Sequence, residues 1–338
     1  MIVAKFGGTA TAPNNVKYLQ KCLGKHHGVV VVSAIGREFD GDEKVTDLLG
    51  RYWHGDDNAW TRIADKFRRL CLINAVEVDV EKLLADAKMR ARKFGSDYCL
   101  SLGEELTARC IAKLTGREYV EAQEYVVFDG GKFKLKETLR RLKELGGNRV
   151  VMGGFYGGTI DGNRQTFTRG GGDVSGALCA AACNATLYEN VTDVDGVFVA
   201  NPRLVDGAQK LDGLSYDEML LLAKSGASVL HPDAVEICRK YNVPIAVKSF
   251  WKNDFGTLVS NCVGCGDVLG VTCKRSVDGT YATTVLHNLS AKDVALRMWV
   301  LCDGYDGIAH MECNGRVVRM QSEDDVTKEV YQAFVLRN

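Results

Sequence analysis

The sequence predicts an α/β protein with a mainly parallel sheet that helices cover on both faces, followed by a small α+β unit. Short, almost continuous apolar runs such as residues 28–35 are typical of parallel strands buried on both faces. These runs alternate with stretches of helical periodicity as far as residue 260, which favours repeated βα units. Residues 268–338 differ, because several short strands there precede a closing helix.

The expected elements follow one another in a regular order. The first strand, residues 1–6, leads into a helix over 14–24 with asparagine at its start and glycine at its end. A later helix over 215–226 opens with a capping box between Ser215 and Glu218. The other expected strands are 28–35, 148–155, 185–190, 243–250 and 256–260, and the other helices are 80–95, 103–116, 135–147, 173–183 and 233–242. In the tail, the expected strands are 268–275, 295–303, 307–313 and 316–321, and the closing helix is 322–336.

The composition is that of a globular protein with a sizeable core. Of the 338 residues, 46% are hydrophobic and 25% are charged. Lysine and arginine together number 43, as do aspartate and glutamate, and this zero net charge argues against nucleic-acid or membrane-surface partners. No apolar stretch approaches the ~20 residues of a membrane span. The opening residues lack the pattern of a signal peptide, so we expect a cytoplasmic protein.

The cysteine pattern and the search for familiar nucleotide motifs argue against a zinc site, a P-loop protein, a dinucleotide-binding fold and a protein kinase. Among twelve cysteines only Cys262 and Cys265 form a CxxC, without a second pair or a histidine cluster at zinc spacing, so we assign no metal ligand. The P-loop pattern is absent, and no GxGxxG joins the first strand to its helix. A DFG triplet at 254–256 lacks the catalytic loop that would make it a protein-kinase motif.

Glycine-bearing loops follow three of the expected strands. Ligands of parallel sheets bind at this end of the strands, and bare backbone amides at a helix N-terminus favour anions. In one of these loops, Arg169 and Asp173 flank the three glycines 170–172. A flexible surface turn is one interpretation. In the other, the two charged side chains hold a zwitterion, with Arg169 as a bidentate fork for its carboxylate.

Individual charged residues at these loops each allow two interpretations. Lys5 ends a buried strand before two glycines, so it either reaches phosphates or caps the sheet end. Glu104, at the start of the helix over 103–116, either binds a ligand cation or compensates the helix dipole. Thr192, Asp193 and Asp195 follow a strand, where they either form a turn or contact the sugar and base of a nucleotide.

Taken together, these motifs resemble the aspartate kinases of the amino acid kinase superfamily. The matching stretches are KFGGTA, VVSAIG, LGEELTA, GGFYG, TRGGGDVSGA, VTDVDGVFVANPR and SGASVLHPDAV, in the order and approximate spacing of that family. The resemblance covers about residues 1–260, and the tail resembles a single ACT-type module where the familiar enzymes carry two. The sequence departs from the family at Ala10 and Gly172, where serine is usual, and in a longer segment over 37–44.

The resemblance implies ATP-dependent phosphorylation of the L-aspartate side-chain carboxylate to 4-phospho-L-aspartate. This reaction is the first step of the biosynthesis of lysine and the other aspartate-family amino acids. The implied architecture is an amino acid kinase-type sandwich over 1–262 and an ACT-like module over 268–338. Mg²⁺ would accompany ATP, and a homodimer would form through the C-terminal module, with little or no inhibition by lysine or threonine.

The resemblance also assigns roles residue by residue. The catalytic residues would be Lys5 and Asp173; aspartate would be bound by Thr46, Glu104, Phe155, Arg169, Gly170 and Asp173; ATP would be bound by Lys5, Gly7, Gly8, Ser33, Thr192, Asp193, Phe198, Arg203 and Lys252. Two alternatives stay open. One is an amino acid kinase acting on glutamate or another small carboxylate, and the other is a non-catalytic amino-acid sensor on the same fold.

Overall fold

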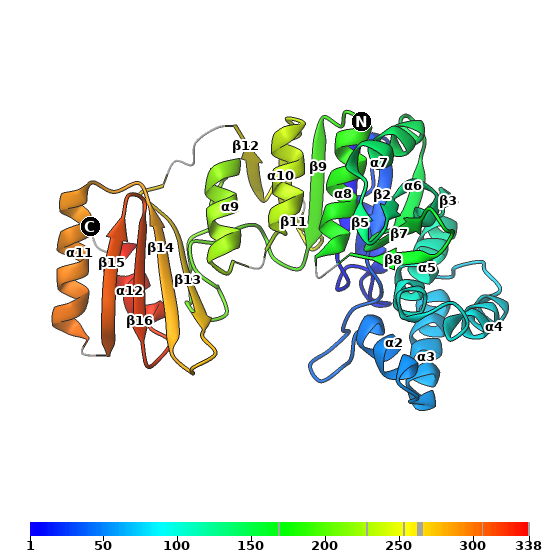
Figure 1. Ribbon diagram of the computed structural model, residues 1–338, viewed down its shortest axis with the longest axis horizontal. Helices are drawn as coiled ribbons and strands as arrows, with labels where there is room; N and C mark the ends of the chain where they lie inside the picture. Colours follow the sequence, from blue (N-terminus) through cyan, green and yellow to red (C-terminus); the bar gives the residue numbers. More distant parts are fainter. Residues whose placement is uncertain (168–169, 228, 253, 262–265, 306, 337–338) are drawn as a thin grey trace.

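An eight-stranded sheet forms the centre of the protein. The computed structural model describes the chain except residues 168–169, 228, 253, 262–265, 306 and 337–338 (Figure 1). The strand order is β10-β12-β11-β9-β1-β2-β6-β3, and all neighbours are parallel except β11 and β12. The strands are β1 (Ile2–Phe6), β2 (His27–Val32), β3 (Glu118–Val120), β6 (Val150–Gly153), β9 (Leu187–Thr192), β10 (Gly213–Ser215), β11 (Ile245–Ser249) and β12 (Thr257–Ser260). The predicted fold class, a mainly parallel sheet within an α/β protein, is confirmed.

Helices cover both faces of this sheet, as the apolar runs predicted. Every residue of β2 is buried, because helices lie above and below it. One apolar core contains residues of α7 (Leu135–Leu142), α8 (Gly171–Ala182), α9 (Tyr216–Ser225) and α10 (Pro232–Lys240). The other core contains residues of α1 (Val16–Cys22), α2 (Val45–Trp53), α3 (Asp57–Ile73), α4 (Val80–Ala91) and α5 (Ser96–Thr115). Alternate residues of β1 therefore enter different cores.

A small second sheet lies beside the first. Its order is β5-β4-β7-β8, with β4 (Val127–Asp129), β5 (Lys132–Phe133), β7 (Tyr156–Thr159) and β8 (Arg164–Thr166). The short helix α6 (Ala122–Tyr125) and a 3₁₀ turn over Lys143–Leu145 complete this region. Phe128, Phe133 and Phe167 pack together there, with ring centroids 5.0 to 5.7 Å apart. This packing anchors the chain just before the glycine turn that leads into α8.

The C-terminal residues form a separate antiparallel sheet with two helices. The order is β13-β14-β16-β15, with β13 (Val268–Arg275), β14 (Tyr281–His287), β15 (Ile308–Asn314) and β16 (Val317–Ser322). The helices are α11 (Ala291–Gly304) and α12 (Thr327–Phe334). Figure 1 shows this unit at the opposite end of the molecule from α2, α3 and α4, with α9 and α10 between them.

One expected strand of the tail is wrong. Residues 295–303 lie within α11, which Ser290 caps at its N-terminus. The buried positions Val294 and Leu301 are seven residues apart, which is the spacing of one helical face. A short apolar run cannot be assigned to helix or strand by its hydrophobicity alone, and here the serine cap was the decisive signal. The strand that belongs to this sheet, β14, was not among the expected elements.

Two further differences concern the lobe that holds α2 to α5. The helices α2 and α3 were not expected, although both are amphipathic. The helix expected over 103–116 begins earlier, at Ser96. Glu104 therefore lies in the middle of α5 and does not compensate the dipole at its start. Among the described residues, no helix is both long and apolar enough to cross a membrane.

Candidate active site

An ion pair between Lys5 and Asp173 lies at the centre of the site. Lys5 is near the end of β1, and its Nζ is 2.7 Å from Oδ1 of Asp173, in the first turn of α8. The amide Nδ2 of Asn190, on the neighbouring strand β9, donates to the same oxygen at 3.0 Å. The second oxygen, Oδ2, accepts the backbone N–H of His231 at 3.1 Å. Residues of β1, of β9 and of the start of α10 thus hold one carboxylate, and this carboxylate in turn fixes Lys5.

Two of these residues were missed by the sequence analysis. Asn190 is directly beside Lys5 in the register of the parallel pair β1 and β9. A buried asparagine inside an apolar strand was the available signal, because a buried amide needs a polar partner. His231 belongs to one of the motifs that carry the family resemblance, but its contact with Asp173 joins segments 58 residues apart. Nothing in the spacing of the sequence indicated that contact.

The glycine turn before α8 has a distinct requirement at each position. Gly170 has φ +82°, and a Cβ there would lie 2.2 Å from Cδ2 of His231, so both backbone and neighbour exclude a side chain. Gly172 is inside α8. A Cβ there would lie 3.2 Å from Oγ of Ser33 and 3.4 Å from Cε of Lys5. Gly172 thus faces the lysine and the loop after β2, which is where the resemblance placed the site.

The loops after β1 and β2 touch through their backbones. The N–H of Gly7 donates to the carbonyl of Val191 at 3.0 Å, and the N–H of Gly36 donates to the carbonyl of Gly8 at 2.8 Å. A Cβ on Gly36 would lie only 2.5 Å from the carbonyl carbon of Gly8. Side chains are therefore excluded between these loops, and the glycines keep them next to Lys5.

Glu104 brings a buried carboxyl group to the site. It is 5% exposed, and its Oε2 has no hydrogen-bond partner among the described residues. Burial raises the pKa of Glu104 to about 8, against a smaller opposite effect of the backbone N–H of Ala34. Ala34 directly follows Ser33, so Glu104 and the Lys5 side of the site share one loop. A buried carboxyl with an unused oxygen suits a ligand cation.

Phe155 and the glycine turn are packed together. Phe155 has φ +75°, which is rare for a bulky residue, and its N–H donates to Oγ of Ser175 at 3.1 Å. A Cβ on Gly171 would lie 3.2 Å from Cα of Phe155. The strained residue is thus fixed directly beside the turn. Arg169, expected to bind the substrate carboxylate, lies outside the described residues.

Thr46 is placed by the long segment that precedes it. It occupies the first turn of α2, which begins where the N–H of Val45 donates to the carbonyl of Ile35 at 3.0 Å. The preceding segment is anchored by an ion pair of Asp42 with Lys66 of α3, and both side chains are buried. Thr46 is therefore close to the loop after β2.

A cavity of about 420 Å³ adjoins the end of β9. Four residues expected to bind ATP line it, namely Thr192, Asp193, Phe198 and Arg203. The side chain of Arg203 is 81% exposed and only loosely paired with Asp193, at 3.8 Å. Lys252 is not among the described residues that line the cavity. It is exposed and forms an ion pair with Asp195. Lys252 is thus engaged by Asp195, in the same loop as Asp193, without contributing to the described lining of the cavity.

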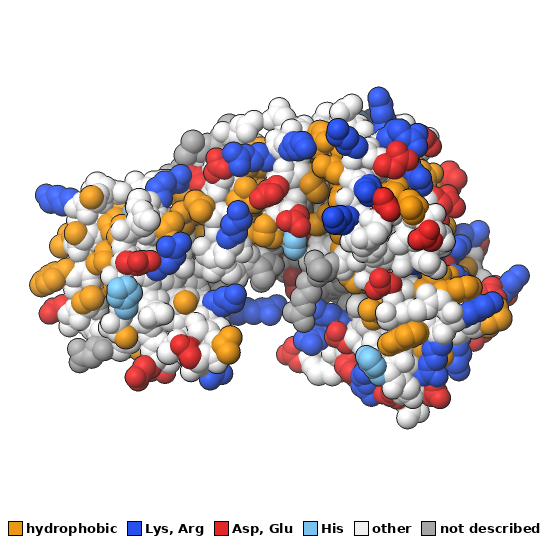
Figure 2. Space-filling model, viewed as in Figure 1, with side chains coloured by type: hydrophobic (Ala, Val, Ile, Leu, Met, Phe, Trp, Pro, Cys, Tyr) orange, Lys and Arg blue, Asp and Glu red, His pale blue; other side chains and the backbone are white. Residues whose placement is uncertain are grey.

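The two halves of the site lie along one edge of the sheet. Lys5, Gly7 and Gly8 are at the ends of the central strands, and Thr192 follows Val191, whose carbonyl binds Gly7. Figure 2 shows the surface hollowed between the C-terminal unit and the lobe of α2 and α3, with Lys and Arg side chains bordering the hollow. Among the described residues, no group of three or more His, Cys, Asp or Glu could hold a metal ion. Cys262 and Cys265 lie outside the described residues.

Comparisons with known proteins identify the family of this chain. The sequence profile of the Amino acid kinase family matches residues 1–249. Aspartokinase 2 of Bacillus subtilis is 32% identical over 278 residues, which cover 77% of this chain and 58% of that protein. The aspartokinase of Bacillus sp. strain MGA3 is 37% identical over 276 residues, with the same coverage of both chains. This chain thus spans less than two thirds of the length of these relatives.

Solved structures share the fold. The aspartate kinase of Clostridium acetobutylicum superposes with a TM-score of 0.85 at 22% identity, covering 99% of this chain and 100% of that chain. Aspartokinase III of Escherichia coli, in complex with aspartate and ADP, gives a TM-score of 0.70 at 21% identity, covering 97% of this chain and 80% of that chain. The profile match extends over most of the residues that form the parallel sheet and its glycine loops. The chain therefore belongs to the amino acid kinase family.

Proposed function

We propose that this chain transfers the γ-phosphoryl group of ATP to the side-chain carboxylate of L-aspartate, giving 4-phospho-L-aspartate and ADP. The observation that carries the proposal is the Lys5–Asp173 ion pair beside the glycine loops, with the carboxyl of Glu104, whose Oε2 has no partner among the described residues, across the same loop. Lys5 and the glycine loops suit phosphates, and the carboxyl of Glu104 suits an ammonium group. The similarity to curated aspartokinases supports aspartate as the acceptor.

The reaction needs positioning and charge neutralisation. An oxygen of the aspartate side chain attacks the γ-phosphorus, a new P–O bond forms, and the bond to the bridging oxygen breaks as ADP leaves. The attacking carboxylate is already ionised, so no proton is removed from it. Lys5 stabilises the negative charge that moves onto the leaving oxygen, and Asp173 holds Lys5 in place.

The site fits a magnesium ion that is carried by the nucleotide. Mg²⁺ prefers phosphate oxygens and water with only one or two protein carboxylates, and the described residues offer no larger ligand cluster. Both oxygens of Asp173 already accept from Lys5, Asn190 or the N–H of His231, so the nucleotide phosphates and water would hold the ion. When bound, Mg²⁺ would neutralise phosphate charge.

The substrate groups can be assigned to residues on the two sides of Lys5. We assign the α-ammonium of aspartate to Glu104 and its α-carboxylate to Arg169, with Thr46, Phe155 and Gly170 shaping the pocket. ATP phosphates are assigned to Lys5, Gly7, Gly8 and Ser33, and the nucleoside to Thr192, Asp193, Phe198 and Arg203. Lys252 stays a weaker assignment, because Asp195 already engages it.

Our proposal extends to domain organisation and assembly. We assign residues 1–262 to the kinase domain and 268–338 to an ACT-like module, because β13 to β16 with α11 and α12 make a compact α+β unit. Its edge strand β15 is largely exposed, and unpaired strand edges readily join a second copy. On this basis we propose a homodimer through the C-terminal unit. We further propose that the enzyme acts in the cytoplasm, in lysine biosynthesis.

An acceptor comparison tests the proposed function. ADP release would be followed with Mg²⁺ and ATP in the presence of L-aspartate, of L-glutamate or of no acceptor, with hydroxylamine to trap the acyl phosphate. We expect ADP release and hydroxamate only with L-aspartate. Faster release with glutamate would indicate another amino acid kinase. ADP or aspartate binding without turnover would indicate a sensor, and either outcome would overturn the proposal.

The carboxyl of Glu104 should make aspartate use depend on pH. With a pKa of about 8 the free enzyme holds Glu104 largely neutral at pH 7, whereas an ammonium ligand favours its ionised form. The value of kcat/KM for aspartate should therefore rise with pH up to about 8. Glu104→Gln should lower kcat/KM by about tenfold or more, since a charge-assisted hydrogen bond contributes about 1.5–3 kcal/mol. It should also abolish this rise with pH.

The same substitution should affect stability in the opposite sense. The folded pKa lies above the unfolded value of 4.5, so the folded state retains the proton and loses stability as pH rises from 4.5 towards 8. Glutamine stays neutral, so Glu104→Gln should raise Tm at pH 8.5 relative to the wild type more than at pH 5. The exposed Glu118→Gln provides a charge-matched control. Equal effects of Glu104→Gln at the two pH values would contradict this account of Glu104.

Gly172→Ser tests which way the glycine turn faces. Position 172 is helical, so serine meets no backbone strain, and its Cβ would point towards Ser33 and Lys5. One added hydrogen bond to the substrate contributes about 0.5–1.5 kcal/mol, which predicts a KM for aspartate that is about twofold to tenfold lower, with kcat nearly unchanged. Gly172→Ala separates the hydroxyl from the added bulk. Unchanged kinetics in both variants would show that this position does not face the substrate.

A further inference from the structure

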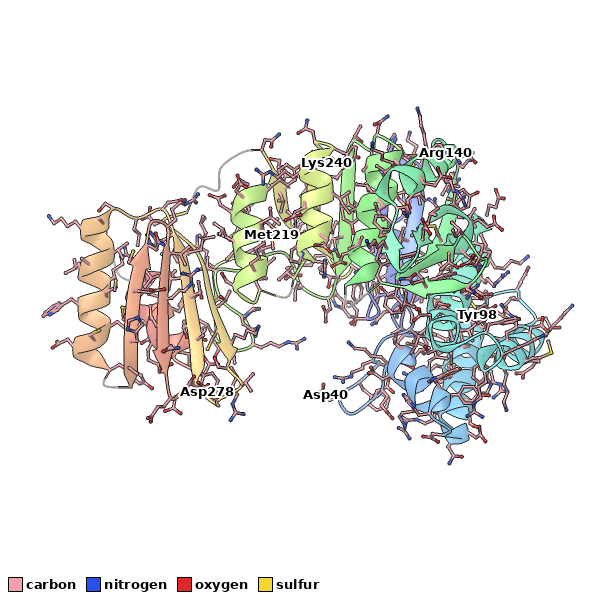
Figure 3. All side chains as sticks on the ribbon, in the orientation of Figure 1. Asp40, Tyr98, Arg140, Met219, Lys240 and Asp278 are labelled. Carbon is pink, nitrogen blue, oxygen red and sulfur yellow. The ribbon has the colours of Figure 1, made fainter. Side chains whose placement is uncertain are left out.

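The cavity beside Thr192 is built by both units of the chain. One side belongs to residues 1–262, here called the kinase unit, and includes Thr192, Asp193, Phe198 and Arg203. The opposite side consists of Val271, Thr272 and Cys273 of β13 and Thr327 of α12. No motif of the sequence assigned any of these four residues to a site. Figure 3 shows Asp40 and Asp278, from the loop before α2 and the turn after β13, on either side of the hollow seen in Figure 2.

Hydrogen bonds fix this second side against the kinase unit. The backbone N–H of Val271 donates to the carbonyl of Val199, in the same loop as Phe198. The hydroxyl of Tyr331 on α12 accepts the N–H of Gln209 at 3.1 Å. The hydroxyl of Thr272 donates to the carbonyl of Ser225 at 3.0 Å. The loop that carries the predicted nucleotide residues is therefore held in shape by the C-terminal unit.

The chemistry of the cavity suits a nucleoside. Apolar side chains from both units, among them Ala227, Val229 and Val271, offer a surface for a flat base. The charged side chains of the lining, Asp193 and Arg203, both come from the loop that follows β9. A nucleotide whose phosphates rest at Gly7 and Gly8 would extend past Thr192, and its base would then meet β13. The volume of about 420 Å³ lies in the range of small-molecule sites.

We propose that Thr272, Cys273 and Thr327 of the C-terminal unit form part of the nucleoside subsite of this enzyme, so that ATP binds to both units at once. The identity of the nucleotide rests on the proposed function, whereas the shared wall rests on the cavity itself. Because linkage is reciprocal, a nucleotide that contacts both units also stabilises their docking. Any change that moves β13 away from the kinase unit should then weaken ATP binding and leave aspartate binding unaffected.

Chemical protection of Cys273 tests the shared wall in the unmodified full chain. Cys273 is half-buried at the cavity, whereas Cys302 and Cys313 of the same unit are exposed and line no part of it. The chain would be treated with iodoacetamide, with and without saturating Mg²⁺ and ADP, and each cysteine followed by peptide mass spectrometry. We expect ADP to slow modification of Cys273 at least about fivefold and to leave Cys302 and Cys313 unchanged. Equal modification of Cys273 at proven ADP saturation would overturn the proposal.

A filled cavity provides the second test. Cys273→Phe should raise the Kd of ADP, measured by calorimetry, and the KM of ATP by about tenfold or more, with the KM of aspartate within about twofold; tenfold corresponds to about 1.4 kcal/mol. Cys302→Phe, on α11 of the same unit, is the matched control. Unchanged ADP affinity in a folded Cys273→Phe variant would refute the shared wall. A chain that binds ADP without phosphorylating aspartate would instead refute the proposed function alone.

Discussion

The ion pair of Lys5 and Asp173 is the interaction on which the rest of the site depends. Both side chains are largely withdrawn from water, at 11% and 14% exposure, so each charge needs the other. Asp173 is also held by Asn190 and by the backbone of His231. One carboxylate therefore connects β1, β9, α8 and the start of α10. A shift in any of these elements would move the ammonium group of Lys5, for which we propose the phosphates of ATP as the ligand.

The site combines contributions from both faces of the sheet. The glycine turn and Asp173 come from α8, which belongs to one apolar core, whereas Glu104 comes from α5, which packs in the other. The cavity that we propose for the nucleoside adjoins the end of β9 and reaches the C-terminal unit. The site thus requires the whole order of the sheet and cannot be built from one βα unit.

The sequence predicted those parts of the site that depend on local pattern. Valine-rich strands, glycine loops and the lysine at a strand end follow from simple rules, and they place Lys5, Gly170 and Asp173 on one edge. Asn190 and His231 were missed because their roles come from register and from a contact 58 residues apart. The strand expected over 295–303 was wrong because a short apolar run fits either periodicity, and tertiary packing made it part of α11.

A double-mutant cycle on Lys5 and Asp173 tests the central claim most directly. The kcat of aspartate-dependent ADP release would be measured for Lys5→Met, Asp173→Asn and the double variant, with folding checked by Tm. If Asp173 acts by holding Lys5, the two residues work as one unit, and the double variant should lose no more activity than the poorer single variant. Losses that multiply would show that the two residues act independently, and the account of the site given above would then be wrong.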